Sequence, residues 1–556
     1  MNRGPLETKS VWTVSRRELL RYGLCGFVSA SFQGRAGASV GYDTTPIVVE
    51  TSHGKVRGVS EREVSKFLGV RYGAPTAGRN RFMPPQAPTP WAGVVNAIHP
   101  SSIAYQQPRV PNSLYAEVLK GALPWQICSE NSALRGMSED CLFLNIWTSS
   151  IKSSQKRPVM VWLHPGNYIA WAGYSQWTDG TRLAREQDVV LVSLNHRLNV
   201  FGFLDLSEFG EEEWGQSGNV GLLDIISALR WVKDNISSFG GDADNVTIFG
   251  ESGGAGKVSF LLAMPEARGL FHRAVIQSGA RHRARERDHA KAVTRRILGR
   301  LGINDWNLNS IQNIEPAKLV AATATETFVP VLNDALPAHP VSKAGLEVSK
   351  DIPVVLGTNA DERAYADLNG AADHVVDEAT LREALAKVGW LRPDSPSATL
   401  LEAYRREFGN SSPRQTYLDI FGMLEEARAT SMATRRVEQG GASSYLYLFN
   451  WRSSGWGGRF GACHTFEIPF VFDNLAAAKQ LFSGGLDAQV IGLARAMGAS
   501  WCTFARVGDP NNKTIPHWGA YGADKRETML IDCTWEARQD PAERVRRAFG
   551  NLPFDF

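Results

Sequence analysis

The stretch between Val246 and Lys257 constrains the fold of this chain more than any other. An apolar run, Val246–Phe249, leads directly into Gly250-Glu-Ser252-Gly-Gly254, a form of the G-x-S-x-G pattern. The run predicts a strand, and glycines at both ends of the pentapeptide let the backbone turn tightly into a helix. A serine held in such a turn is strained and exposed, as functional residues often are. We therefore predict a strand, a sharp turn and a helix, with Ser252 as a candidate nucleophile.

The same glycines also suit a phosphate-binding loop, because Lys257 directly follows Gly256. A Walker loop requires a glycine five residues before that second glycine, and Ser or Thr directly after the lysine. Here these positions hold Glu251 and Val258, and Val cannot ligate magnesium. The mismatches argue against a phosphate loop. A chance occurrence of the serine pattern stays open until further catalytic residues are found.

A serine hydroxyl needs a base to remove its proton, and the base needs a carboxylate to fix its tautomer. When the nucleophile follows a strand in this way, the chain order is Ser, then Asp or Glu, then His. Downstream, Ile352–Leu356 predicts a buried strand, and the adjacent carboxylates Asp361 and Glu362 follow its end. Further on, His464 lies in Gly461–Phe472. These residues complete a candidate set in the required order.

The segments around Ser252, Glu362 and His464 are similar to those of the type-B carboxylesterases, the family that includes the cholinesterases. The resemblance extends from about Ile47 to the C-terminus. Further segments that carry it are Phe67–Pro75, Arg81–Pro85, Ser138–Asn145, Asn195–Phe203, Gly218–Asp224, Asn235–Asp242, Gln277–Gly279 and Phe328–Val331. Many ordered segments make this signal far more specific than one motif.

The resemblance implies that Ser252 is the nucleophile, His464 the general base and then acid, and Glu362 the orienting carboxylate. The family pattern Asp-Glu-Gly selects Glu362 over Asp361. Glu467 and Asp140 are interpreted as structural charges. The implied activity is hydrolysis of a carboxylic ester through an acyl-enzyme. Two alternatives remain: hydrolysis of an amide, carbamate or lactone by the same triad, and a binding protein that keeps the fold without the chemistry.

Acyl transfer needs backbone amides that stabilise an oxyanion. One donor is expected from Gly253, directly after the nucleophile. The family carries three glycines after the strand that ends at Leu163, whereas this chain reads His164-Pro165-Gly166-Asn167. Pro165 has no amide hydrogen, but the family's donors align with Gly166 and Asn167. Asn tolerates a positive φ better than most residues, so the oxyanion hole is expected to survive.

Buried strands alternate with amphipathic helices along the chain, which predicts an α/β fold: the α/β-hydrolase architecture, with a central, mostly parallel sheet covered by helices on both faces. A helix is expected from Leu222 to about Ile236, and an antiparallel meander at the start of the domain. The meander comprises Ile47–Ser52, Lys55–Ser60 and Val64–Tyr72. Further strand candidates are Val159–Leu163, Val189–Leu194, Ala274–Gln277, Pro353–Leu356 and Ser444–Phe449.

Residues 1–38 are expected to be a twin-arginine signal peptide, removed to leave a single catalytic domain at 39–556. Ser15-Arg16-Arg17 begins the export motif, a weakly apolar stretch follows it, and Ala36-Gly-Ala38 is a small-x-small cleavage site. A disordered tail with a chance Arg pair is the alternative. The apolar stretch is too short for a permanent membrane span. We therefore expect an exported protein, periplasmic or secreted.

Charge and cysteine usage exclude several classes of function. With 60 basic and 57 acidic residues, the net charge is only +3, and nothing suggests nucleic acid binding. No His and Cys spacing is typical of a metal site, and the mechanism needs no cofactor. Loss of Cys25 with the leader leaves five cysteines. From the family's half-cystine region, the resemblance implies a possible disulfide between Cys128 and Cys141.

Four aromatic residues crowd the segment after the candidate oxyanion loop: Tyr168, Trp171, Tyr174 and Trp177. At the mouth of the site they would favour a small apolar or aromatic ester as substrate. Alternatively, they pack the core. The sequence leaves both possibilities open.

Overall fold

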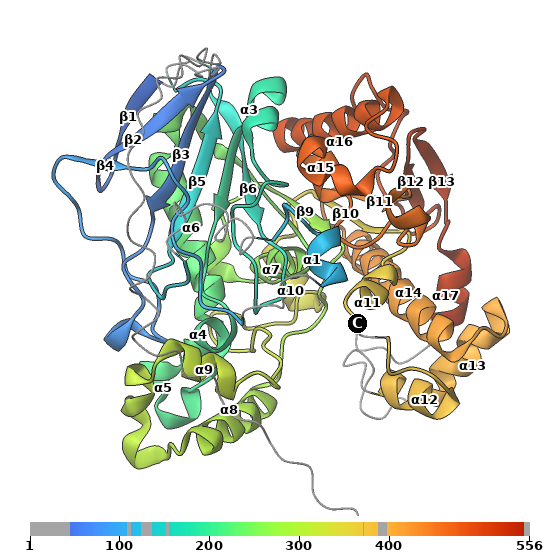
Figure 1. The fold of residues 1–556 in the computed structure, drawn as a ribbon, viewed down its shortest axis with the longest axis horizontal. Coiled ribbons are helices and arrows are strands. Elements are labelled where there is room, and N and C mark those ends of the chain that lie inside the picture. The colour runs from blue at the N-terminus through green and yellow to red at the C-terminus, as the bar shows by residue number, and fades with distance from the viewer. Residues whose placement is uncertain are drawn as a thin grey trace, which may run out of the picture. The chain divides into compact units, whose positions relative to one another are not determined.

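A mixed β-sheet runs through the chain from Thr45 to Gln539 (Figure 1). The computed structural model describes residues 45–107, 113–123, 136–151, 155–370, 372–386 and 397–549. Within them thirteen strands pair into one sheet. The strands are β1 (Thr45–Thr51), β2 (Gly54–Glu61), β3 (Val64–Arg71), β4 (Val94–Asn96), β5 (Phe143–Thr148), β6 (Arg157–Leu163), β7 (Val190–Leu194), β8 (Gly241–Glu251), β9 (Arg273–Gln277), β10 (Val354–Asn359), β11 (Ser444–Phe449), β12 (Glu527–Ile531) and β13 (Glu536–Gln539).

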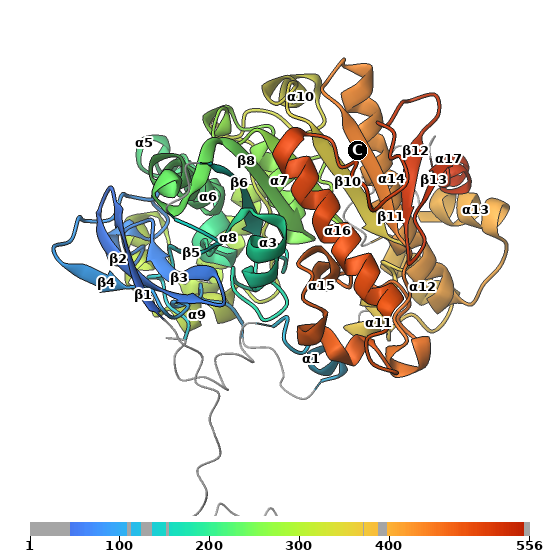
Figure 2. The ribbon, with the colours of Figure 1, turned by 90° about the horizontal axis from the view of Figure 1, so that it is seen from above.

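The order of the strands is β1-β2-β3-β5-β7-β6-β8-β9-β10-β11-β12-β13, and β4 pairs with β2. From β7 to β12 all neighbours are parallel, whereas β1, β2, β3, β5 and β7 pair antiparallel. Figure 2 shows β1 to β4 at one edge of the sheet and β13 at the other. The predicted α/β fold with an antiparallel start is thus confirmed.

Alternate residues of the central strands enter two different cores, because side chains of a strand point to opposite faces in turn. On β6, Val159, Val161 and Leu163 belong to one cluster, and Met160 and Trp162 belong to the other. All five are fully buried. A strand buried on both faces is typical of a parallel sheet between helical layers.

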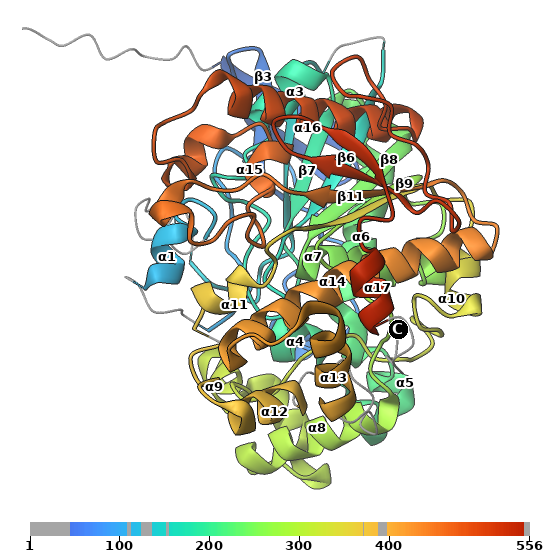
Figure 3. The ribbon, with the colours of Figure 1, turned by 90° about the vertical axis from the view of Figure 1, so that its right-hand side faces the viewer.

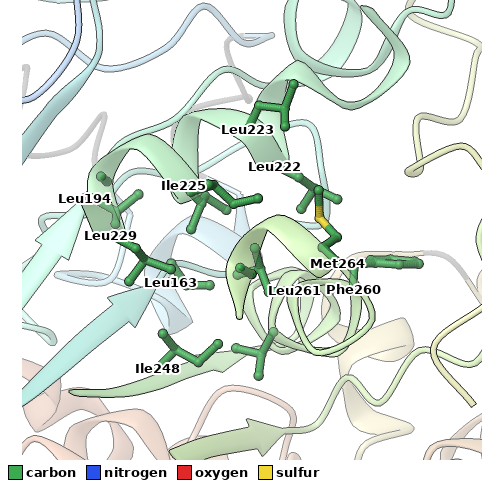
Figure 4. Packing of buried hydrophobic residues seen from close by; sticks show 14 of the residues in the cluster. Leu163, Leu194, Leu222, Leu223, Ile225, Leu229, Ile248, Phe260, Leu261 and Met264 are labelled. Atoms are coloured by element: carbon green, nitrogen blue, oxygen red, sulfur yellow. The ribbon is translucent and has the colours of Figure 1, made fainter. Parts of the chain in front are cut away.

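Helices α6 (Val220–Asn235) and α7 (Gly253–Leu261) cover one face of the sheet. Figure 4 shows Leu229 of α6 beside Leu163 of the sheet, and Leu222 of the same helix beside Met264. Helices α3 (Thr181–Gln187) and α16 (Ala488–Val507) cover the other face. Figure 3 shows the sheet between α16 on one side and α7 and α14 (Pro413–Glu438) on the other. The predicted helix from Leu222 to about Ile236 corresponds to α6.

A third hydrophobic cluster joins α12 (Glu378–Ala386), α13 (Ser397–Phe408), the first half of α14 and α17 (Glu543–Phe549). The second half of α14 packs on the sheet through Ala429, Met432 and Ala433. The remaining α-helices are α1 (Leu114–Val118), α4 (Asn199–Phe203), α5 (Glu211–Trp214), α8 (Arg287–Leu301), α9 (Pro316–Ala322), α10 (Lys343–Val348), α11 (Ala364–Leu368) and α15 (Ile468–Val471).

The predicted signal peptide, residues 1–38, lies outside the described residues. In the part of the chain that the structure describes, no helix has the length and apolar character needed to cross a membrane.

Candidate active site

Ser252 occupies the turn between β8 and α7 in a backbone conformation that only a tightly packed turn can hold. Its φ is +53° and its ψ is −119°, outside the regions open to ordinary residues. The Ser252 N–H donates to the Gln277 carbonyl at 2.8 Å, which ties the turn to the end of β9. A Cβ on Gly250 would lie 2.6 Å from the carbonyl carbon of Gly254, so only glycine fits there. The serine is partly exposed, as a nucleophile must be.

Glu362 and His464 lie together just beyond the end of β10. Glu362 Oε2 is 2.5 Å from His464 Nδ1, and the Asn359 N–H donates to Glu362 Oε1 at 2.8 Å. The Asp361 N–H donates to the carbonyl of Ala462 at 3.1 Å, which joins the two segments. The structure therefore brings together two residues that are 102 positions apart in the sequence.

The neighbouring carboxylate Asp361 faces away from the histidine and has structural partners of its own. It accepts a hydrogen bond from the Ala462 N–H at 2.9 Å and pairs with Arg452 at 3.0 Å. Glu362 therefore contacts the histidine and Asp361 contacts other groups, in line with the choice of Glu362 as the orienting carboxylate. Asp140 is likewise structural, since it forms two hydrogen bonds to Arg71 at 2.6 and 2.8 Å.

Glu251, directly before the nucleophile, is a site residue that sequence reasoning missed. Its side chain is fully buried, and its Oε1 lies 3.2 Å from His464 Nε2. Neither oxygen of Glu251 has a hydrogen-bond partner among the described residues. Burial, outweighing the attraction of His464, raises the pKa of this carboxyl well above its usual range. Its position inside the serine motif was the one available signal.

His464 is more basic in this site than an ordinary histidine. Burial alone would lower its pKa, but Glu251, Glu362 and Glu467 outweigh burial and raise it to about 10. Glu467 accepts hydrogen bonds from Asn359 Nδ2 at 2.7 Å and Gln277 Nε2 at 3.1 Å, so it serves as a structural charge as expected. In the described part of the chain, no hydrogen bond joins His464 to Ser252. Nε2 faces Glu251 instead.

The loop after β6 presents two amides whose directions are set by its carbonyls. His164 Nδ1 lies 2.7 Å from the Pro165 carbonyl, and since a carbonyl only accepts, the ring nitrogen donates. The Gly166 carbonyl accepts from the N–H groups of Ile169 at 3.2 Å and Ala170 at 3.1 Å. In a planar trans peptide the N–H points opposite to the carbonyl. Because hydrogen bonds hold the Pro165 and Gly166 carbonyls in place, the N–H groups of the next residues, Gly166 and Asn167, have set directions.

Gly253 brings the third amide of the predicted oxyanion hole against this loop. A Cβ on Gly253 would overlap the backbone of Asn167, so the glycine permits a close approach of α7 to the loop. Gly166 and Asn167 have φ values of +91° and +54°, the left-handed region that favours Gly and Asn. None of the three N–H groups donates a hydrogen bond within the described residues. The Gly253 amide directly follows Ser252 and lies against the loop that carries the other two unbonded N–H groups.

Comparison with known proteins shows the family of this chain. The sequence pattern of the carboxylesterase family matches residues 45–548. The chain belongs to the carboxylesterase family. It is 33% identical to the para-nitrobenzyl esterase of Bacillus subtilis over 90% of this chain and 98% of that protein. It is 30% identical to carboxylesterase 1E of Mus musculus, over 91% and 94%.

Solved structures place this carboxylesterase-family chain in the same fold. The carboxylesterase EST55 of Geobacillus stearothermophilus aligns with a TM-score of 0.78 and 33% identity, covering 90% of this chain and 99% of that one. The family and the fold expected from the sequence are therefore confirmed, and so is the class of enzyme, the carboxylic-ester hydrolases.

The structure bears on two possibilities that the sequence of this carboxylesterase-family chain left open, the place of the aromatic residues and the state of Cys141. Tyr168, Trp171 and Trp177 are at most 3% exposed and pack in the core, so they do not line the mouth of the site. Cys141 is a free thiol, 1% exposed, and its pKa is raised by burial. The Cys128–Cys141 disulfide is therefore not found: Cys141 packs as an apolar core residue, and Cys128 lies outside the described residues.

Proposed function

We propose that this chain hydrolyses carboxylic esters through an acyl-enzyme on Ser252. The proposal rests on a strained, partly exposed serine, which is followed by Gly253 and packed near the loop of Gly166 and Asn167, three residues whose N–H groups donate no hydrogen bond within the described residues. A developing oxyanion requires preorganised donors of this kind, and a binding protein would not need them.

The reaction follows from the positions of the groups. Ser252 Oγ attacks the ester carbonyl while His464 Nε2 accepts its proton, and the amides of Gly166, Asn167 and Gly253 bind the oxyanion. The imidazolium, held through Nδ1 by Glu362, then protonates the leaving alcohol. Water attacks the acyl-enzyme with His464 again as base, which releases the acid and restores Ser252. For the first step His464 Nε2 must turn from Glu251 to the hydroxyl.

We infer a small ester with an apolar or aromatic group as the substrate. The support is a cavity that two residues of the segment after Asn167 help to line; its lining is mixed, with apolar Ile169, Ala170, Val320, Ala324 and Phe328 and polar Gln107, Asn199, Thr323 and Glu326. Ile169 follows Asn167 by two residues and is 37% exposed. The apolar part of this lining would favour an apolar or aromatic group on the ester.

The test uses the chain from Ser39 onward with p-nitrophenyl esters of increasing acyl length, beside the Ser252→Ala variant. Hydrolysis by the parent protein and none by the variant is expected, with a fluorophosphonate probe labelling only the parent. Activity in both proteins would mean that a different group is the nucleophile. Inactivity in both, without labelling, would favour the binding-protein alternative.

We also propose that the protein is exported by the twin-arginine route and acts in the periplasm or outside the cell. The support is the order Arg16-Arg17, apolar stretch and Ala36-Gly-Ala38, all before residue 45, where the family match begins. A bacterial host with this pathway should process the parent chain to a start near Ser39. The Arg16→Lys/Arg17→Lys double variant should accumulate unprocessed in the cytoplasm. Equal export of both forms would contradict the proposal.

A further inference from the structure

Lys257 is a buried cation that the proposed reaction does not use. It is the fifth residue of α7, and its side chain is fully buried. Among the described residues it forms no ion pair with a carboxylate within 4 Å. Burial lowers its pKa to about 7, which shows how unfavourable the site is for a charge. An apolar chain of similar length would fill the space without this desolvation cost.

The partners of Lys257 are the two ends of the oxyanion loop. Its Nζ donates to the Asn167 carbonyl at 2.8 Å and to the His164 carbonyl at 3.3 Å. The same ammonium lies 5.6 Å from the centroid of the Tyr168 ring, at a distance suited to a cation–π contact. One side chain thus holds the first and last residues of the loop that carries two of the three donors.

The third donor belongs to the same helix as Lys257. Gly253 begins α7, and Lys257 lies about one turn further along it. The hydrogen bonds of Lys257 therefore connect the loop amides and the helix amide into one unit. The close approach of Gly253 to Asn167 depends on the same contact between loop and helix.

We propose that Lys257 is a positioning residue. It holds the His164–Asn167 loop against α7 and so fixes the positions of the three oxyanion donors relative to one another. The inference rests on the proposed ester hydrolysis. It assigns a role to the Gly256-Lys257 pair, which the Walker comparison left without one.

The main experiment compares the parent chain with Lys257→Met, which keeps the length of the side chain but removes its charge and donors. Because the oxyanion exists only in the transition state, kcat should fall about 10- to 100-fold while KM stays nearly constant. Binding of a trifluoromethyl ketone, which forms an oxyanion on Ser252, should weaken by a similar factor. Active sites are counted by fluorophosphonate labelling, so that misfolded protein does not lower kcat.

Ser259→Ala is the matched control, since Ser259 is buried on the same helix but bonds to Ala255 and Arg281, away from the loop. It should lower the melting temperature and leave kcat unchanged. If Lys257→Met does not fold, Lys257→Gln decides, because its side chain is uncharged and too short to reach both carbonyls: a lowered kcat at constant KM supports the proposal.

The outcomes separate this inference from the proposed function. An unchanged kcat per labelled site in Lys257→Met or Lys257→Gln, with an active parent, overturns the role of Lys257 alone. A parent protein that hydrolyses no ester overturns the proposed function and this inference with it.

Discussion

At the residue scale, the contact between Glu251 and His464 helps to determine the pH range in which His464 is neutral and can act as a base. A general base must be neutral to accept a proton, yet three carboxylates raise the pKa of His464 to about 10. Glu251 is the only one of them at Nε2, the nitrogen that must serve Ser252. Protonation of Glu251, which its own raised pKa favours, would remove one negative charge and free His464.

Glu251→Gln should therefore shift the acidic limb of the kcat/KM profile to lower pH. Loss of one negative charge beside His464 lowers the pKa of the imidazolium, so the neutral base persists at lower pH. The measurement is a pH–rate profile with an aryl ester. The surface variant Glu266→Gln, 40% exposed at its side chain, should leave the profile unchanged. An identical acidic limb in both variants would refute this account of His464.

Gly253→Ala should lower kcat about 100-fold. The added methyl would overlap the backbone of Asn167 and push the oxyanion loop away. Steady-state kinetics on labelled sites would show the loss. Gly299→Ala, in an open position on α8, should leave kcat intact and add up to about 1 kcal/mol of stability. A fully active Gly253→Ala variant would mean that the loop accommodates the methyl.

The sequence predicted the residues of the site better than their contacts. Ser252, Glu362 and His464 came from motif order and resemblance, and the structure brings Glu362 against His464. Their catalytic roles stay predictions. Glu251 and Lys257 were visible in the same motif, but their burial and partners depend on loops far away in the sequence. No local pattern reveals such contacts.

At the scale of elements, the ion pair between Arg197 and Asp224 fixes α6 to the end of β7. Arg197 donates to Asp224 through Nε at 2.8 Å, Nη2 at 2.6 Å and its backbone N–H at 2.9 Å. Both side chains are at most 2% exposed. Neither charge can be satisfied by water if its partner is removed.

Asp224→Ala should accordingly lower the free energy of unfolding by about 3–5 kcal/mol, because Arg197 would remain buried without its partner. Urea unfolding measures the loss. The surface pair Arg230–Glu266 offers the comparison: with side chains 55% and 40% exposed, Arg230→Ala should cost about 0–1 kcal/mol. Equal losses in the two variants would show that burial does not set the cost.

The strands with apolar runs and the alternating strands of the opening meander were predicted, whereas β4, β5, β12 and β13 were not. Side chains on both faces of β6, β7 and β9 are buried, so the sequences of these strands are mostly apolar and easy to recognise. β5 was not predicted because Asn145 interrupts its apolar pattern. β13 was not predicted because all four of its residues are exposed. Edge strands owe their existence to the neighbouring strand, which a local pattern does not contain.

At the scale of the whole molecule, the thiols report the redox state of the folded protein. Cys141, Cys463 and Cys502 are buried free thiols, and Cys533 is exposed. The chain from Ser39 onward, denatured without a reductant, should therefore show five reactive thiols by titration. Three reactive thiols would indicate one disulfide and would be consistent with a Cys128–Cys141 bond. The Cys141→Ala variant, which should then show four, tests whether Cys141 is one of the two bonded cysteines.

The alternation along β6 also limits how this protein can change during evolution. Each residue of β6 from Val159 to Leu163 is committed to one of two cores, and Leu163 leads into the oxyanion loop. Inserting one residue into β6 would exchange the cores for every side chain beyond it and turn the loop away from Ser252. Insertions and deletions are therefore tolerable only beyond the strand ends. Lineages of this protein can acquire new substrates by rebuilding loops, while the length of β6 stays constant.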